Sequence, residues 1–288
     1  MVGVFPGSPW SSPIGGQARL TNVSGRSVAG SGSSVLIEGF VITGPPNSQE
    51  QVLLRADGPA LAQFGLAGSL LTQPSLSVYD SAGDLLATNT GWGNALNAPA
   101  VANAAAAAGA FALQSGSADS ALLINLVPGA YTMQISGANQ TTGVALGEVY
   151  EMGSSGSSVI NLSSRGMVTA GGPLINGLAI SGTAPQQVLV RGDGPALAAF
   201  GVANPLAQPV LQLFDSNGNL VASNTGWSTN SNATQIASAA ATVGAFAIQS
   251  GSADSALLIT LQPGNYTVVV TGAGGTTGVA LAETYIVP

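Results

Sequence analysis

The sequence predicts an all-β protein with two tandem antiparallel β-sandwich or jelly-roll domains, each containing one short Ala-rich helix. The first observation behind this prediction is a perfect repeat: QSGSADSALLI occurs at residues 114–124 and again at 249–259, a period of 135 residues (249 − 114). A unit of that length can close its own hydrophobic core. The second observation is that each copy is a succession of short apolar runs separated by turn signals. The third is that only one stretch per copy favours a helix, whereas a parallel α/β fold needs a helix between most strands.

The strands of the first copy are predicted from short apolar runs, such as VLIEGFVIT and QVLLR, and from alternation of apolar and polar residues, as in SLSVY and YTMQIS. In chain order they are expected at residues 19–23, 35–43, 51–55, 75–79, 85–89, 121–126, 131–136 and 143–150. The segment DSAGD is predicted to form a hairpin turn. The second copy carries the same motifs, so the same elements are expected there.

The helix of the first copy is predicted over residues 97–108, because Ala has the highest intrinsic helix propensity and Gly109 supplies a C-terminal stop. Its counterpart in the second copy covers residues 233–243.

The predicted organisation is an N-terminal extension at residues 1–17, a first repeat at 18–151, a linker at 152–158 and a second repeat at 159–288. The linker is flexible by composition. The extension carries Val2, Val4 and Trp10, and two interpretations stay open: it folds back on its own domains, or it docks on a neighbouring molecule by adding a strand to a sheet edge. The chain has few charges to blunt such edges, which makes them open to partner strands.

The composition excludes most catalytic chemistry. The chain has no His and no Cys, and all five of its cationic side chains are Arg. It therefore cannot build a Ser-His-Asp triad, a thiolate or imidazole zinc site, or a lysine Schiff base. We expect no enzymatic activity and no cofactor. The net charge of −7 and the scattered arginines argue against nucleic acid as a partner, and no apolar stretch is long enough for a membrane span.

Two pairs of motifs are candidate ligand sites. Asp80 and Asp84 in DSAGD, and Asp215 in DSNGN, are candidate Ca²⁺ ligands, although a hairpin turn requires Asp, Asn and Gly for backbone reasons alone. Trp92 and Trp227 each follow N-T-G, and they either stack on a sugar ring or plug the edge of the sandwich.

A third set of residues is predicted to form structural ion pairs. The alternation in QVLLR places an Arg beside the core strands, where its charge must be paired, and the last strand of each repeat offers a Glu within an apolar run. The set consists of Arg55, Asp57 and Glu148 in the first repeat and Arg191, Asp193 and Glu283 in the second.

The motif order RLxNxSxR, VLIxGFxIxG, QVLLRxxGPALxxFG, LxVYDSxGxLLATN and DSALLxxLxPGxYT resembles an uncharacterised repeat module of large secreted proteins from environmental bacteria. The later portion is also similar, more distantly, to bacterial pre-peptidase C-terminal domains. The resemblance implies an extracellular β module with no assigned catalytic residues, placed outside the cell or at its surface.

These observations lead to three functional hypotheses. The first is a non-enzymatic extracellular structural protein that self-assembles into a fibre, sheath or biofilm matrix, with head-to-tail contacts through the N-terminal extension. The second is a carbohydrate-binding or adhesive module that recognises a polysaccharide. The third is an accessory domain pair of a secreted enzyme.

Overall fold

The computed structural model describes residues 19–66, 69–153 and 156–288, so Val2, Val4 and Trp10 of the predicted extension lie outside the described residues. The elements of the first repeat are β1 (Arg19–Ala29), β2 (Leu36–Thr43), β3 (Glu50–Asp57), β4 (Pro74–Asp80), β5 (Leu85–Asn89), α1 (Ala98–Ala108), β6 (Ser120–Leu126), β7 (Gly129–Gly137) and β8 (Gly143–Glu151). Those of the second repeat are β9 (Ser158–Val168), β10 (Leu174–Ser181), β11 (Gln186–Asp193), β12 (Pro209–Asp215), β13 (Leu220–Asn224), α2 (Ala233–Thr242), β14 (Ser255–Leu261), β15 (Gly264–Gly272) and β16 (Gly278–Ile286). The predicted all-β class with one short Ala-rich helix per repeat is confirmed.

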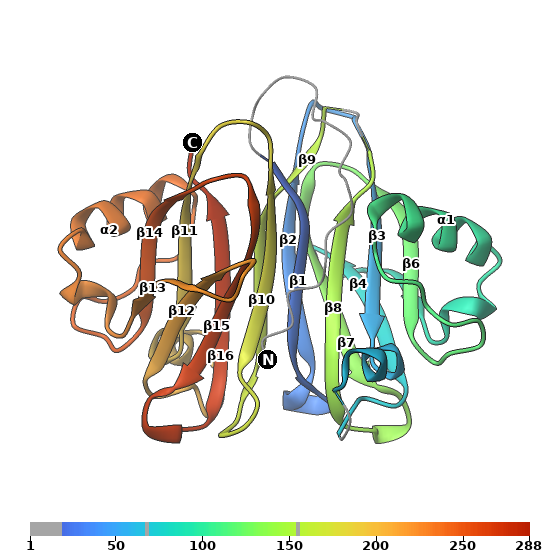
Figure 1. Ribbon diagram of the computed structural model, residues 1–288, viewed down its shortest axis with the longest axis horizontal. Coiled ribbons are helices and arrows are strands. Elements are labelled where there is room, and N and C mark those ends of the chain that lie inside the picture. The colour runs from blue at the N-terminus through green and yellow to red at the C-terminus, as the bar shows by residue number, and fades with distance from the viewer. Residues whose placement is uncertain (1–18, 67–68, 154–155) are drawn as a thin grey trace.

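The strands form two antiparallel layers that each run through both repeats (Figure 1). One layer has the order β6-β3-β8-β1-β10-β15-β12-β13. The other has the order β14-β11-β16-β9-β2-β7-β4-β5. The two layers touch at the centre, where Val28 of β1 pairs with Met167 of β9.

The repeats are joined by hydrogen-bonded strands, which we call the joint: β1 pairs with β10, and β2 pairs with β9. The pairing is equivalent on both sides, since Gly25 lies opposite Asn176 in one layer and Glu38 lies opposite Ser164 in the other. The predicted linker separates β8 from β9 in the sequence. In space, both layers nevertheless continue from one repeat into the other through the strand pairs of the joint. The sequence suggests that the sheet edges are open to foreign strands. At the joint, the inner edges of each repeat are instead occupied by strands of the other repeat.

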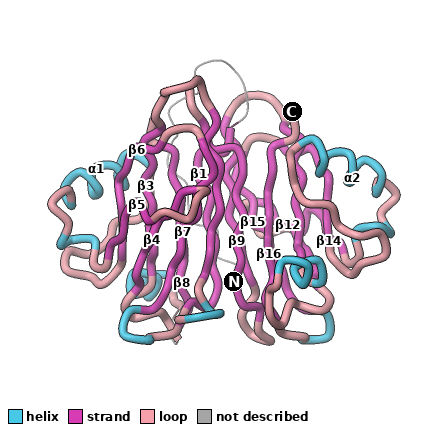
Figure 2. Tube along the Cα trace, turned by 180° about the vertical axis from the view of Figure 1, so that it is seen from behind, coloured by secondary structure: helices cyan, strands magenta, loops and turns pink. Residues whose placement is uncertain are grey.

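Four strands are paired on one side only: β5 and β6 at the end of the molecule with α1, and β13 and β14 at the end with α2 (Figure 1 and Figure 2). Among these, β5 and β13 are equivalent in the two repeats. Both are short, and both contain an irregularity in register, between Val78 and Tyr79 on β4 and between Leu213 and Phe214 on β12. Short strands and bulges are two ways in which proteins discourage edge pairing. Because neither β5 nor β13 contains a charged residue, the expectation that an outer edge can accept a partner strand stays a prediction for these two strands.

The main core lies between the two layers and follows the two-residue period of the strands. On β3, Val52, Leu54 and Ala56 point into this core, while Leu53 and Arg55 point to the outer face. That outer face is covered by α1 in the first repeat and, equivalently, by α2 in the second. The helices thus create a second buried compartment in each repeat, and this compartment contains the charged residues.

Candidate functional site

The candidate site of the first repeat is a charged cluster under α1, which we call the Arg55 cluster. Arg55 and Asp57 come from β3, and Glu148 comes from the adjacent β8, where it pairs directly with Arg55 in the strand register. All three are buried. The alternation of β3 sends both of its charged side chains to the outer face, so the cluster follows from the strand period.

The guanidinium of Arg55 is engaged on every side. Its Nη2 lies 3.0 Å from Asp57 Oδ2, and its Nε lies 3.2 Å from Glu148 Oε2. Its Nη1 donates to the carbonyl of Phe111 at 2.9 Å, and the guanidinium carbon lies 4.2 Å from the centre of the Phe111 ring. The hydroxyl of Tyr150 donates to Glu148 Oε1 at 2.7 Å. These contacts are the kind a buried cation requires to offset its lost hydration.

The second repeat reproduces this geometry almost atom for atom in what we call the Arg191 cluster. Arg191 Nη2 lies 2.9 Å from Asp193 Oδ2, and its Nε lies 3.2 Å from Glu283 Oε2. Its Nη1 donates to Phe246 O at 2.8 Å, and Tyr285 donates to Glu283 Oε1 at 2.7 Å. The structure thus places each of the six predicted ion-pair residues in contact with its predicted partners.

Each cluster holds two carboxyl groups against one guanidinium. Burial raises the pKa of Asp57 well above its usual range; Arg55 opposes this rise, and Glu148 adds to it through its charge and a hydrogen bond. The pKa of Asp193 is raised for the same reasons, with Glu283 in place of Glu148. A proton held on the Asp leaves one carboxylate facing one guanidinium. The cluster then has no net charge, which is the least costly state inside a protein.

The perfect repeat at 114–124 is explained by two residues that sequence reasoning passed over, Asp119 and Ser120. Asp119 Oδ1 accepts from the backbone N–H of Gly58 at 2.8 Å and of Ala60 at 3.2 Å, at the start of the 3₁₀ helix η2 (Pro59–Phe64) that follows Asp57. Ser120 Oγ donates to the carbonyl of Pro74 at 2.9 Å. These hydrogen bonds connect the segment that contains Asp119 and Ser120 to distant parts of the first repeat. The repeated Asp-Ser pair therefore makes tertiary contacts.

Asp254 and Ser255 occupy the same places in the second repeat. Asp254 Oδ1 accepts from Gly194 at 2.7 Å and from Ala196 at 3.2 Å, and Ser255 donates to Pro209 O at 2.8 Å. The signal that could have identified all four residues is the identity of the eleven-residue segment, because an Asp-Ser pair that only needed to be polar would not have to be identical in both copies.

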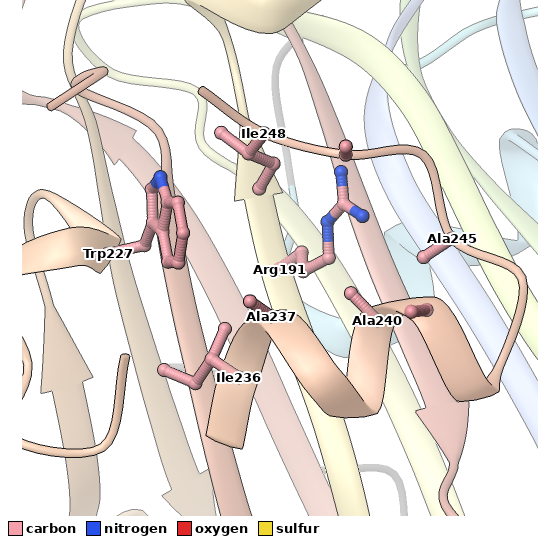
Figure 3. Close-up of a pocket in the computed structure, with 9 residues that line it drawn as sticks. Arg191, Trp227, Ile236, Ala237, Ala240, Ala245 and Ile248 are labelled. Atoms are coloured by element: carbon pink, nitrogen blue, oxygen red, sulfur yellow. The ribbon is translucent and has the colours of Figure 1, made fainter. Parts of the chain in front are cut away.

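A small pocket lies beside the Arg191 cluster, between α2 and the outer face of the sheet. Its volume is about 120 Å³, and its walls are mainly apolar: Trp227, Ile236, Ile248 and five Ala side chains, with Arg191 at one side. Figure 3 shows the Trp227 ring and the Arg191 guanidinium on opposite sides of the hollow above α2. Since Arg191 already faces two carboxyl groups, the pocket offers apolar contact and no uncompensated positive charge.

The two tryptophans are interior side chains. Trp92 and Trp227 are both buried and pack against α1 and α2, respectively. Their indole N–H groups donate to Gln114 O at 3.2 Å and to Gln249 O at 3.1 Å. The packing interpretation accounts for these contacts, and sugar stacking stays a prediction.

The predicted Ca²⁺ ligands serve the hairpin backbone. Asp80 Oδ1 accepts from the N–H groups of Ala82 and Asp84, each at 2.9 Å. Asp215 Oδ1 accepts from Asn217 and Asn219 at the same distances. Across the described ranges, no group of three or more Asp, Glu, His or Cys side chains is arranged to hold a metal ion. The turn interpretation accounts for these residues.

No family model matches the chain, and no curated protein matches it. Among solved structures, it is similar to tandem CBM51 modules of the family 98 glycoside hydrolase from Streptococcus pneumoniae, with 7% identity, 90% of this chain and 83% of that chain covered, and a TM-score of 0.24. It is also similar to a DUF4785 family protein from Legionella pneumophila, with 8% identity, 99% and 86% coverage and a TM-score of 0.24. A third structure, the VP2 subviral particle of infectious bursal disease virus, gives 10% identity, 97% and 74% coverage and a TM-score of 0.16. Within the part of the chain that the structure describes, no helix is long and apolar enough to cross a membrane.

Proposed function

We propose that this chain is a non-enzymatic structural protein outside the cell or at its surface, and that copies assemble end to end into a fibre, sheath or matrix. The observation that carries the proposal is a matched pair of exposed aliphatic side chains on each of the equivalent edge strands β5 and β13. On β5 these are Leu85 and Leu86, exposed to 56% and 45% of their surface. On β13 they are Leu220 and Val221, exposed to 52% and 41%. We call them the β5 patch and the β13 patch.

The two patches suit contact with a second copy of the chain. They occupy equivalent strands at opposite ends of the molecule, and neither strand contains a charged residue. The joint provides a precedent on the same scaffold, since a sheet edge of one repeat there pairs with a sheet edge of the other. Apolar side chains on a strand with free N–H and C=O groups lose water on contact and gain hydrogen bonds with a partner edge.

A contact between the β5 patch of one copy and the β13 patch of the next is heterologous. Because the patches lie at opposite ends, each copy would still have one free patch after binding, and the assembly would grow as an open chain. Contacts of this kind would build a head-to-tail fibre like the one the sequence suggested, with β5 and β13 as the contacting strands. The N-terminal extension remains a second candidate for the contact.

The buried clusters support the non-enzymatic part of the proposal. Their charged side chains are covered by the helices, and each Arg contacts two carboxyl groups and a backbone carbonyl. A substrate would have to displace α1 or α2 to reach them. The carbohydrate-binding alternative stays a prediction without a described aromatic platform to support it.

The experiment uses two variants, Leu85→Asp/Leu86→Asp and Leu220→Asp/Val221→Asp. Sedimentation velocity over a concentration series should show polymers for the wild type and monomers for each variant alone. An equimolar mixture of the two variants should form dimers and nothing larger, because one intact patch of each kind remains. Val127→Asp, at an exposed position outside both patches, is the matched control and should assemble like the wild type.

Each alternative gives a different result. A monomeric wild type at high concentration would overturn the proposal. Dimers of each variant alone would show like-with-like contacts and overturn the head-to-tail arrangement. Polymers of both patch variants that disappear when residues 1–17 are deleted would transfer the contact to the N-terminal extension.

A further inference from the structure

The centre of the joint is built from small residues that fit together in only one combination. Gly25 and Ser27 of β1 point into the space between the layers, and Ser164 and Gly166 of β9 point toward them. Arg26 and Arg165 are equivalent in the two repeats, so Gly25 corresponds to Ser164, and Ser27 corresponds to Gly166. Each repeat thus has one Gly and one Ser at these positions, in opposite order.

In the folded chain, each serine faces the glycine of the other repeat. A Cβ placed on Gly25 would overlap Ser164 Oγ and lie 2.9 Å from Ser164 Cβ. A Cβ placed on Gly166 would lie 2.7 Å from both Ser27 Cβ and Ser27 Oγ. Such separations are far inside carbon van der Waals contact, so neither position accepts a side chain while its partner keeps one.

A further difference between the repeats lies on the neighbouring strands, in contacts within each repeat. Glu38 of β2 and Asn176 of β10 are equivalent, and both are buried between the layers. A Cβ on Gly147 of β8 would overlap Glu38 Oε1, whereas the corresponding residue of β16 is Ala282, whose carbonyl accepts from Asn176 Nδ2 at 3.2 Å. The longer acid therefore faces the residue without a side chain, and the shorter amide faces the residue with a methyl group.

We propose that the joint is a selective recognition surface, on which the β1 and β2 edges of the first repeat accept a second repeat and reject a copy of the first. If two first repeats paired, Ser27 would meet Ser27, and two buried Glu38 side chains, each lying against Gly25 of its own repeat, would be brought to one joint. If two second repeats paired, Ser164 would meet Ser164. The partner that this surface fits is a second-type repeat, either in the same chain or in another copy of it.

This inference concerns the joint and does not depend on the β5 and β13 patches, so the two proposals can fail separately. Assembly could be absent while the joint remains selective, and a permissive joint would leave end-to-end assembly unaffected.

The first test moves a serine across the joint in the full-length chain. Gly166→Ser should lower the melting temperature by roughly 5 °C, because a side chain is forced into an occupied position. Adding Ser27→Gly should restore most of that loss, because the serine and the glycine have exchanged places. Gly171→Ser is the matched control, since a Cβ there meets nothing within 4 Å. A double variant no more stable than Gly166→Ser, or a Gly166→Ser that behaves like Gly171→Ser, would overturn the inference.

The second test measures partner choice directly. A protease site is inserted between β8 and β9, the folded full-length protein is cleaved, and the nicked protein is held in mild denaturant so that repeats can exchange. Native mass spectrometry should then find pairs of one first and one second repeat, without the statistical share of like pairs. Random pairing, or complete separation of the halves, would count against a selective joint.

Discussion

Replacing Arg55 with Met should destabilise the protein strongly and in a pH-dependent way. Met fills the aliphatic part of the site, so the main loss is the cation that faces Asp57 and Glu148 at 3.0 and 3.2 Å. Removing one partner of a buried ion pair costs about 3–5 kcal/mol. For a protein of this size each kcal/mol lowers the melting temperature by roughly 2–4 °C, so we expect a decrease of about 10 °C.

The sign of the pH dependence follows from Asp57. Its pKa is already raised by burial, and Arg55 is the group that holds it down, so the substitution raises it further. A carboxyl whose pKa is higher in the folded state than in the unfolded state contributes stability at low pH, and this contribution is lost as the pH rises. The deficit of Arg55→Met should therefore be smallest near pH 4 and grow toward pH 8.

Urea unfolding followed by tryptophan fluorescence measures this deficit, because Trp92 and Trp227 are buried in the two outer compartments. Arg191→Met should give a deficit of similar size, because the second cluster has the same geometry. Arg165→Met, at a half-buried position on the other side of β9, is the control and should change the free energy of unfolding by less than about 0.5 kcal/mol. If Arg55→Met and Arg165→Met unfold alike, or if the deficit shrinks as the pH rises, the account of the cluster is wrong.

Three further predictions concern other buried groups and the hairpin turns. Glu38→Gln should flatten the dependence of stability on pH between pH 5 and pH 9. Burial raises the pKa of Glu38 well above its usual range, so the wild type loses stability as the pH rises and that group ionises. Equal slopes of the unfolding free energy against pH in urea titrations of the two proteins would contradict this. Asp119→Ala and Asp254→Ala should each lower the free energy of unfolding by about 1–3 kcal/mol in the same assay, because each leaves two backbone N–H groups without their acceptor. A change within experimental error would contradict the assigned hydrogen bonds. Addition of EDTA should leave the melting temperature unchanged, because Asp80 serves its own hairpin backbone, and a drop of several degrees would reveal a metal site.

Local patterns predicted the strands whose surroundings are similar along their whole length. The alternation at 75–79 and 131–136 matches β4 and β7 within two residues, because one face of each lies in the core. β1 was predicted to end at residue 23, yet it continues to Ala29 through Ser24-Gly25-Arg26-Ser27. These residues have low strand propensity, and pairing with β8 and β10 overrides it.

The candidate site was predictable where a charge had to be paired within one sheet. Arg55 and Glu148 sit at adjacent register positions, and the apolar context of both strands indicated burial. Asp119 was missed because a Gly- and Ser-rich segment is typical of a loop, and Glu38 was missed because a single acid within VLIEGFVIT resembles an ordinary variation of an apolar run. The joint could not be predicted, because a strand edge that pairs with another repeat has the same local pattern as a free edge.

The joint also determines the order in which this chain can fold. Ser27 of β1 donates to the carbonyl of Met167, 140 residues further along the chain, and β1 pairs along its length with β8 on one side and with β10 on the other. One edge of β1 therefore waits for β8 and one edge of β2 waits for β7, both late in the first repeat. The other edges of these two strands wait for β10 and β9 of the second repeat. Contacts between such distant segments form slowly. A chain that is translated or exported from its N-terminus would leave one edge of each strand unpaired until the second repeat arrives, and we expect interruptions of synthesis before residue 168 to leave aggregation-prone fragments.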